Sequence, residues 1–202
     1  MVDPVEIRWI KTGIVAGLCA SVFYPALLFA PLPLVATAAV AALLGPAIGM
    51  GSLGLRQLIR LNGESVAAAL GAIHNSLAGG LLTAMVLVQL AVRHRVSDLS
   101  GSSELVGVWL GLDVAWDIYI GLGTISFAWA MLSHPRFRWP FAVPGFALGI
   151  LVILLNLHAF PIPPAEAGSV DVGPFVGLWY LATTVQAWRS LGWARGKLRP
   201  AA

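Results

Sequence analysis

The segment LVATAAVAALLGPAIGMGSLGL, which runs from Leu34 to Leu55, contains no charged residue. An α-helix needs about 20 consecutive apolar residues to cross a bilayer, and this run meets that requirement. Similar runs lie on both sides of it, at residues 12–30, 65–92, 104–132, 141–159 and 172–191. The sequence therefore predicts an all-α bundle of about six membrane-spanning helices.

The composition of the whole chain agrees with this prediction. Of its 202 residues, 58% are hydrophobic and 10% are charged, whereas soluble domains use roughly 25% charged residues. The apolar runs leave no stretch for a separate soluble domain, so we expect residues 1–202 to form one transmembrane domain in a lipid bilayer. Cys19 is the single cysteine, which excludes a disulfide framework and a CxxC redox pair.

The distribution of charge predicts how the chain is threaded. Cytoplasmic segments of membrane proteins carry an excess of Lys and Arg. With the amino terminus inside and six spans, ten of the twelve basic residues lie on the cytoplasmic side: Arg8, Lys11, Arg56, Arg60, Arg136, Arg138, Arg189, Arg195, Lys197 and Arg199. We therefore expect both termini in the cytoplasm. Because the basic residues flank hydrophobic runs, they do not form a nucleic-acid-binding patch.

Glycine pairs at GxxxG spacing recur along the chain. They include Gly45/Gly49, Gly107/Gly111, Gly145/Gly149 and Gly173/Gly177. Small residues at this spacing let helix backbones approach closely within a membrane. Their presence in several spans favours a closed bundle, and the same glycine-rich faces are candidate contacts with partner proteins or with a second copy of the chain.

The stretch LDVAWDIY at residues 112–119 places two carboxylates within a predicted span. Asp113 and Asp117 are four residues apart, so they share one helix face. A charged aspartate at the bilayer centre costs about 3 kcal/mol on the insertion scale, and the pair must therefore face protein or water. A functional interpretation is a site for a proton, a cation or a polar ligand; the alternative is that both side chains lock the bundle through hydrogen bonds.

Other polar residues within the spans are candidate ligand-binding or ion-binding residues beside the aspartates. They are His74, Asn75, Asn156, His158 and Tyr180. Counting along the helices places Asn156 and Tyr180 in the outer half and His74 with Asn75 below the middle. This arrangement predicts a polar cavity that opens outward. A single intramembrane histidine such as His74 is more often a hydrogen-bonded packing residue than a ligand.

The sequence identifies no catalytic residue, metal or cofactor. Two histidines in different spans permit a bis-histidine haem, and two histidines with two aspartates permit a metal centre, but His74 and His158 are expected at different depths. The only lysines, Lys11 and Lys197, lie outside the spans, which excludes a retinal Schiff base within the bundle. No Walker A motif is present.

Three segments of the carboxy-terminal half carry a resemblance to a protein family. They are LDVAWD at 112–117, NLHAFPIPPAEAG at 156–168 and DVGP at 171–174. Together they resemble uncharacterised six-span bacterial integral membrane proteins. The resemblance implies six spans and a bacterial inner (plasma) membrane, and it implies no activity.

Three functions are compatible with these patterns. The first is binding of a proton, cation or small polar ligand in the outward cavity, for transport or sensing. The second is a non-catalytic accessory subunit of a larger membrane complex. The third is a metal-dependent intramembrane enzyme acting on lipid.

Overall fold

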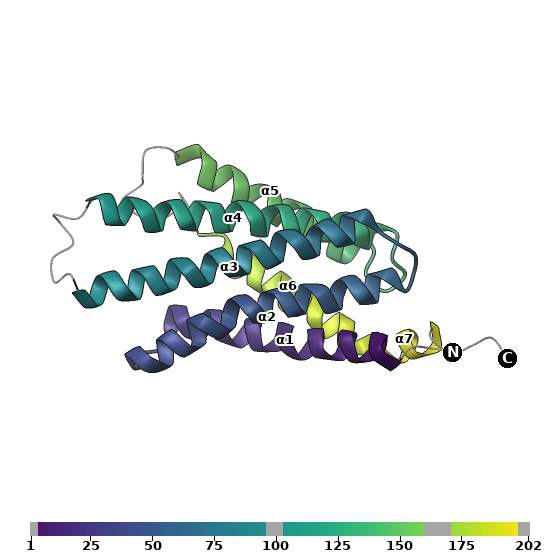
Figure 1. Cartoon of the computed structure of the whole chain (residues 1–202). Helices are drawn as coiled ribbons and strands as arrows, with labels where there is room; N and C mark the ends of the chain where they lie inside the picture. Colours follow the sequence, from purple (N-terminus) through teal and green to yellow (C-terminus); the bar gives the residue numbers. More distant parts are fainter. Residues whose placement is uncertain (1–3, 96–102, 160–170, 198–202) are drawn as a thin grey trace.

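The computed structural model of the chain describes residues 4–95, 103–159 and 171–197. All regular secondary structure in these ranges is helical. The helices are α1 (Pro4–Phe29), α2 (Leu34–Arg60), α3 (Val66–Arg95), α4 (Ser103–Leu132), α5 (Trp139–Ala159), α6 (Gly173–Arg189) and α7 (Leu191–Lys197) (Figure 1). The predicted all-α fold class is confirmed.

Five of these helices, α1 to α5, are long and apolar enough to cross a membrane. They cover the first five predicted spans, and α1 and α2 extend beyond them toward the ends that carry charged residues. The last predicted span corresponds to α6, which has 17 residues. A helix of that length rises roughly 26 Å, a little less than the ~30 Å hydrocarbon core of a bilayer. The helix exists as predicted, but its length alone does not make it a span.

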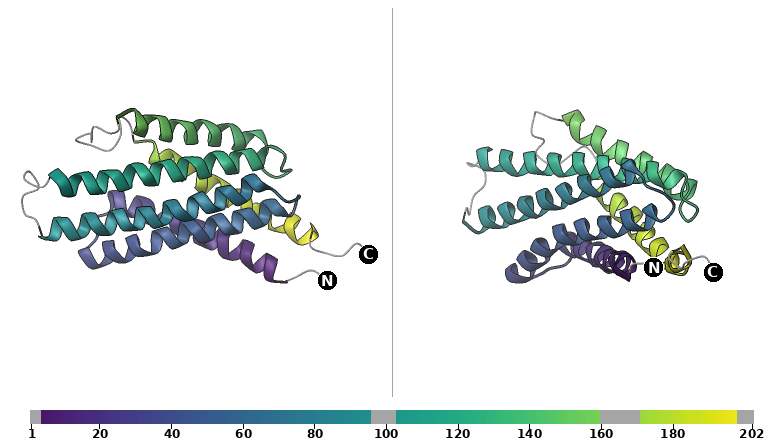
Figure 2. Two further views of the ribbon diagram at one scale, coloured as in Figure 1. Left: turned by 45° about the horizontal axis from the view of Figure 1, so that its top comes forward. Right: turned by 45° about the vertical axis from the view of Figure 1, so that its right-hand side comes forward.

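The first five helices form an antiparallel series in which each helix packs against the next. Helix α6 runs diagonally across this series and packs against α1 and α5 (Figure 2). The short helix α7 continues from α6 at the end of the bundle where α1 begins. We call this end the basal end and the other the distal end.

Pairs of glycines lie at three of the helix crossings. A Cβ at Gly13 of α1 would meet the Cα of Gly54 in α2, and a Cβ at Gly45 of α2 would meet the backbone of Gly79 in α3. In the same way, a Cβ at Gly121 of α4 would lie 2.9 Å from the carbonyl oxygen of Gly149 in α5. Since neighbouring backbones touch at these points, only glycine fits.

The GxxxG pairs in the sequence differ in their surroundings. Gly45 and Gly149 belong to the crossings described above, and Gly173 lies against a side chain of α1. By contrast, a Cβ at Gly107 or Gly111 would meet no atom within 4 Å. This pair therefore faces away from the described part of the bundle.

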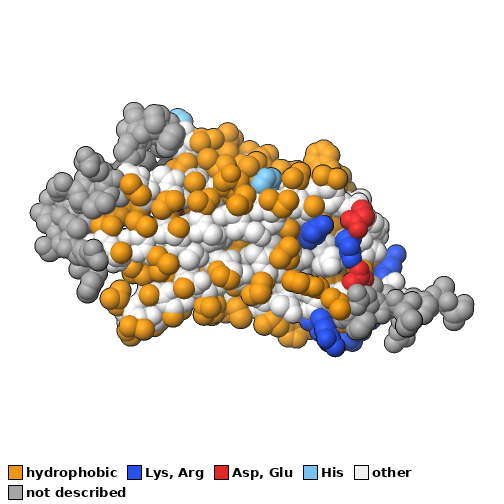
Figure 3. All heavy atoms as spheres, in the orientation of Figure 1, with side chains coloured by type: hydrophobic (Ala, Val, Ile, Leu, Met, Phe, Trp, Pro, Cys, Tyr) orange, Lys and Arg blue, Asp and Glu red, His pale blue; other side chains and the backbone are white. Residues whose placement is uncertain are grey.

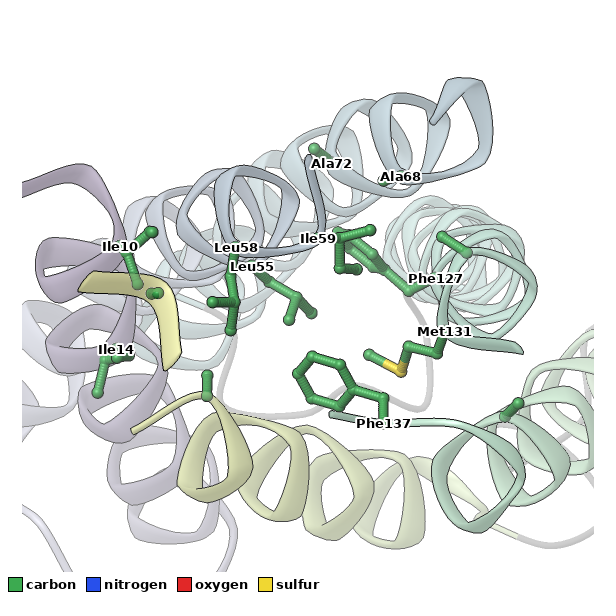
Figure 4. Close-up of a cluster of buried hydrophobic side chains, with 14 of the residues drawn as sticks. Ile10, Ile14, Leu55, Leu58, Ile59, Ala68, Ala72, Phe127, Met131 and Phe137 are labelled. Carbon is green, nitrogen blue, oxygen red and sulfur yellow. The ribbon is translucent and has the colours of Figure 1, made fainter. Parts of the chain in front are cut away.

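Two clusters of buried hydrophobic residues fill the interior. The basal cluster combines residues from all seven helices and the segment between α4 and α5, among them Leu58, Phe127, Met131 and Phe137 (Figure 4). A second cluster lies further toward the distal end and includes Leu44, Leu82, Trp116, Ile120 and Val176.

Charged side chains gather at the basal end, while the long sides of the bundle are mainly hydrophobic (Figure 3). Arg60 of α2 pairs with Glu6 of α1 and lies 3.6 Å from Glu64. This is the charge distribution expected of a bundle whose basal end lies at a membrane surface.

His134 lies buried in the segment between α4 and α5, at the basal end. Its side chain is 1% exposed and packs between the rings of Phe137 and Trp193, with centroids 5.1 and 5.0 Å away. Burial lowers its pKa to about 4; the Leu58 carbonyl partly opposes this shift, and the charges of Arg136 and Lys197 add to it. His134 is therefore neutral at pH 7.

Substitution Gly54→Ala tests the glycine crossing between α1 and α2. The new methyl group would meet the Gly13 backbone and, at 3.0 Å, the Trp9 carbonyl oxygen. We expect a loss of about 1–3 kcal/mol in the free energy of unfolding, as for other overpacked sites, measured by circular dichroism in mixed micelles. Gly111→Ala, at the open position, is the matched control and should leave stability unchanged. Equal stability of the two variants would contradict the close crossing.

Buried His134 predicts that stability depends on pH. The unfolded chain binds a proton with a pKa near 6.5, whereas the folded chain does so near 4. Stability is therefore fully present above about pH 6.5 and declines as the pH falls toward 4. His134→Leu should flatten the thermal unfolding midpoint across this window, while His158→Leu, at an exposed position, should retain the wild-type slope. An unaltered slope in His134→Leu would refute the assignment.

Candidate functional site

A cavity of about 310 Å³ lies between α1, α2 and α6. Its walls are mainly apolar, and Asn75 of α3 with Trp116 and Ile120 of α4 contribute to them. The cavity extends along α1 from Gly13 to Phe29. It arises where α6 lies diagonally over the other helices and contacts α2 only lightly.

Four polar side chains from four different helices form a cluster in the bundle interior. Asn75, which is 0% exposed, donates through Nδ2 to Ser52 Oγ at 2.9 Å and to Tyr180 Oη at 2.7 Å. Tyr180 Oη lies 3.1 Å from Thr124 Oγ1, and Thr124 donates to the Ile120 carbonyl. Because the Thr124 hydrogen is used in that bond, the Tyr180 hydroxyl is the donor to Thr124. The cluster thus ties α6 to α2, α3 and α4, and all its members except Thr124 line the cavity.

The Asn75 side chain is held against α4 by a close contact. Its Oδ1 has no hydrogen-bond partner among the described residues, and a Cβ at Gly123 would overlap this oxygen. Glycine at position 123 therefore makes room for the amide. Burial of this oxygen against a helix backbone fixes the orientation of the whole polar cluster.

His74 follows a different direction from its neighbour Asn75. Successive residues on a helix are rotated by about 100°, and the His74 ring lies beside Tyr119, with centroids 6.2 Å apart. Its Nδ1 is buried and has no hydrogen-bond partner within the part of the chain that the structure describes. His74 does not line the cavity.

The two aspartates of α4 lie in the distal half, partly buried. The amide of Asn156 on α5 is a hydrogen-bond partner of Asp117 and also donates to the Val152 carbonyl at 2.8 Å. Asp113 makes no hydrogen bond within the described ranges. Asp117 is thus joined to α5, a contact that the i, i+4 spacing of the two aspartates does not predict.

A third carboxylate, Asp171, lies at the start of α6. It is exposed and accepts a hydrogen bond from the Gly173 amide at 2.9 Å, two residues along the chain. A Cβ at Gly173 would lie 2.5 Å from Tyr24 Oη and 3.0 Å from Asp171 Oδ1, so the two oxygens flank the same point. Asp171, Asp113 and Asp117 all act electrostatically on the Tyr24 hydroxyl. We call these four residues the acidic cluster.

Of the acidic cluster, Tyr24 lines the cavity, whereas the three aspartates do not. Tyr24 and Gly173 line the cavity, and the Tyr24 ring lies beside that of Trp116, with centroids 6.5 Å apart. Among the described residues, the ion pairs are those of Arg60 with Glu6 and Glu64. No described Lys or Arg is therefore paired with the three aspartates.

The structure brings together some of the residues predicted from the sequence and separates others. Asn75 and Tyr180 meet at the cavity wall, and Asp117 meets Asn156. His158 is exposed near the end of α5, and His74 lies apart from both groups. Tyr24 was not predicted, because a tyrosine near the end of an apolar run has the pattern of an interfacial anchor.

Neither a metal centre nor a relative is identified. Within residues 4–95, 103–159 and 171–197, no three His, Cys, Asp or Glu side chains gather closely enough to hold a metal ion. No protein-family model, curated protein or solved structure matches the chain. The geometry of the cavity and the acidic cluster is therefore the basis for a functional assignment.

Proposed function

We propose that the protein spans a bacterial plasma membrane six times, with both ends of the chain on the cytoplasmic side. Five helices have the length and hydropathy of spans, and α6 returns the chain to the basal end, where α1 begins. Basic residues gather at that end, in accordance with the positive-inside rule. The diagonal α6, extended by α7, completes the sixth crossing in this arrangement.

Within this topology, the protein binds a cation in its distal, outward-facing half. The observation that carries this proposal is the acidic cluster, in which two carboxylates of α4 and one that precedes α6 act on one tyrosine hydroxyl without a described basic partner. Carboxylates inside a membrane bundle are costly and mark ion or substrate sites. A bound cation would offset the repulsion between them.

Hydrogen bonding alone explains only part of the cluster. Asn156 bonds to Asp117 and the Gly173 amide bonds to Asp171, so these two carboxylates also stabilise the helix packing. Asp113 has no such bond among the described residues, and a purely structural role leaves it without a partner. The nearby rings of Tyr24 and Trp116 favour an organic cation, since aromatic faces attract such groups within about 6 Å. Transport or sensing of that cation follows as the physiological role.

Neutralisation of the α4 carboxylates tests the cation site. We expect the double variant Asp113→Asn/Asp117→Asn to bind tetramethylammonium at least about tenfold more weakly than wild type, because it loses two of three attracting charges. Isothermal titration calorimetry with the protein in lipid nanodiscs measures the affinity. Glu64→Gln, at the basal end, is the control and should bind normally. Wild-type affinity in a correctly folded double variant would contradict the proposal.

A second candidate function is that of an accessory subunit in a membrane complex. Its support is the open pair Gly107 and Gly111 on α4, where a Cβ would meet no atom within 4 Å. Small residues at this spacing form close contacts between membrane helices, and here the described chain provides none. A partner helix could therefore pack against this face.

Crosslinking in native membranes tests the docking of a partner helix on α4. We expect wild type to give a crosslinked species that Gly107→Leu/Gly111→Leu lacks, because leucine side chains hold the partner backbone away. The variant monomer should unfold at the wild-type temperature, since these positions are open. A crosslinking pattern that is the same in both proteins would exclude docking through these glycines.

A further inference from the structure

We propose that the ligand is an amphipathic organic cation, whose apolar body occupies the cavity between α1, α2 and α6 and whose charged group lies at the acidic cluster. This inference rests on the proposed cation site and adds to it the chemical class of the ligand. The cavity, rather than the carboxylates, carries the argument.

The cavity and the acidic cluster share part of one wall. Tyr24 and Gly173 both line the cavity. A Cβ at Gly173 would lie 2.5 Å from the Tyr24 hydroxyl and 3.0 Å from Asp171 Oδ1. Trp116 of α4, which lies between Asp113 and Asp117 in the sequence, also lines the cavity. The aspartates themselves do not line the cavity, but a molecule that fills it lies against Tyr24 and Gly173 and is therefore next to Asp171.

The rest of the cavity wall offers few free hydrogen-bonding groups to a polar ligand. Its wall is mainly apolar, and the hydrogens of Asn75 and Tyr180 are already donated within the polar cluster. Thr183 and Thr184 both donate to the Tyr180 carbonyl at 2.8 Å. A hydrated inorganic ion would gain nothing from such a wall, whereas an alkyl chain or ring would be stabilised by burial.

The size and the opening of the cavity agree with a small amphipathic molecule. Its volume of about 310 Å³ is at the lower end of the ~300–1,000 Å³ typical of small-molecule sites. Leu28, Phe29 and Leu178 line it and are 47%, 76% and 60% exposed. The cavity therefore opens at the distal end of α1 and along α6, on surfaces that face the bilayer. An amphipathic cation, which concentrates in membranes, has direct access from there.

A matched series of probes tests the ligand class. Octyltrimethylammonium has both the chain and the charge, tetramethylammonium has the charge alone, and octanol has the chain alone. We expect octyltrimethylammonium to bind the protein in nanodiscs at least about tenfold more tightly than either of the others, with empty nanodiscs subtracted. Equal affinity for the two cations would overturn this inference and leave the cation site standing. Binding of octyltrimethylammonium that matches that of octanol and ignores Asp113→Asn/Asp117→Asn would overturn both.

A cavity-filling variant tests where the alkyl chain of the ligand binds. Gly177 lines the cavity, and a Cβ there would meet the Tyr24 ring at 3.6 Å, an ordinary contact. Gly177→Leu should therefore fold normally and lose at least about tenfold in octyltrimethylammonium affinity, with a much smaller loss for tetramethylammonium. Ala182→Leu, on an exposed face of the same helix outside the cavity, is the control and should bind as wild type. Wild-type binding of octyltrimethylammonium by a folded Gly177→Leu variant would overturn the placement.

Discussion

Direct contact between glycine backbones sets the spacing of α1, α2 and α3, and that of α4 and α5. In a membrane, lipid surrounds the helices with material as apolar as their side chains, so close packing has to replace the hydrophobic effect as the source of cohesion. Gly13 with Gly54 and Gly45 with Gly79 bring α1, α2 and α3 together at their crossings, and Gly121 with Gly149 does the same for α4 and α5. Each crossing also fixes which helix faces turn inward.

The cavity exists because α6 meets its neighbours differently. Its glycines face the Tyr24 side chain rather than a backbone, and Thr184 lies against Gly17 of α1. Side chains thus hold α6 at a distance from α1 and α2, and the space between the three helices stays open. Polar contacts keep α6 in place: Tyr180 accepts from Asn75, Trp179 donates to the Phe141 carbonyl, and Gln186 donates to that of Arg136. Such bonds are directional, so they fix the position of α6 where close packing does not.

The charged residues are distributed unevenly along the bundle. Basic residues gather at the basal end. Toward the distal end, three aspartates act electrostatically on Tyr24, which lines an apolar cavity. An amphipathic cation fits this combination because its two parts need two different surroundings. A single ligand of this kind would account for both the carboxylates and the cavity.

The positions of the helices followed from the sequence because helix formation depends on neighbours along the chain. An uncharged run such as Leu34–Leu55 has to form a helix in lipid, where every backbone polar group must be paired within the segment. The i, i+4 spacing likewise places Asp113 and Asp117 on one face. The length of α6 was less predictable, because its diagonal course depends on the helices that it crosses.

The tertiary structure alone decided which residues form the site. Asn75 and Tyr180 meet although 105 positions separate them along the chain. Tyr24 of α1 is acted on by aspartates of α4 and by Asp171, which precedes α6. The His74 side chain points in a different direction from that of its neighbour Asn75. The sequence contained every one of these side chains, and it also contained glycine pairs of equal spacing that pack, such as Gly45/Gly49, and that stay open, such as Gly107/Gly111. Contacts between helices depend on how whole faces fit together, and this property is absent from any local pattern. The sequence by itself therefore determined a membrane bundle with costly carboxylates, and packing decided which side chains lie near them and where the cavity forms.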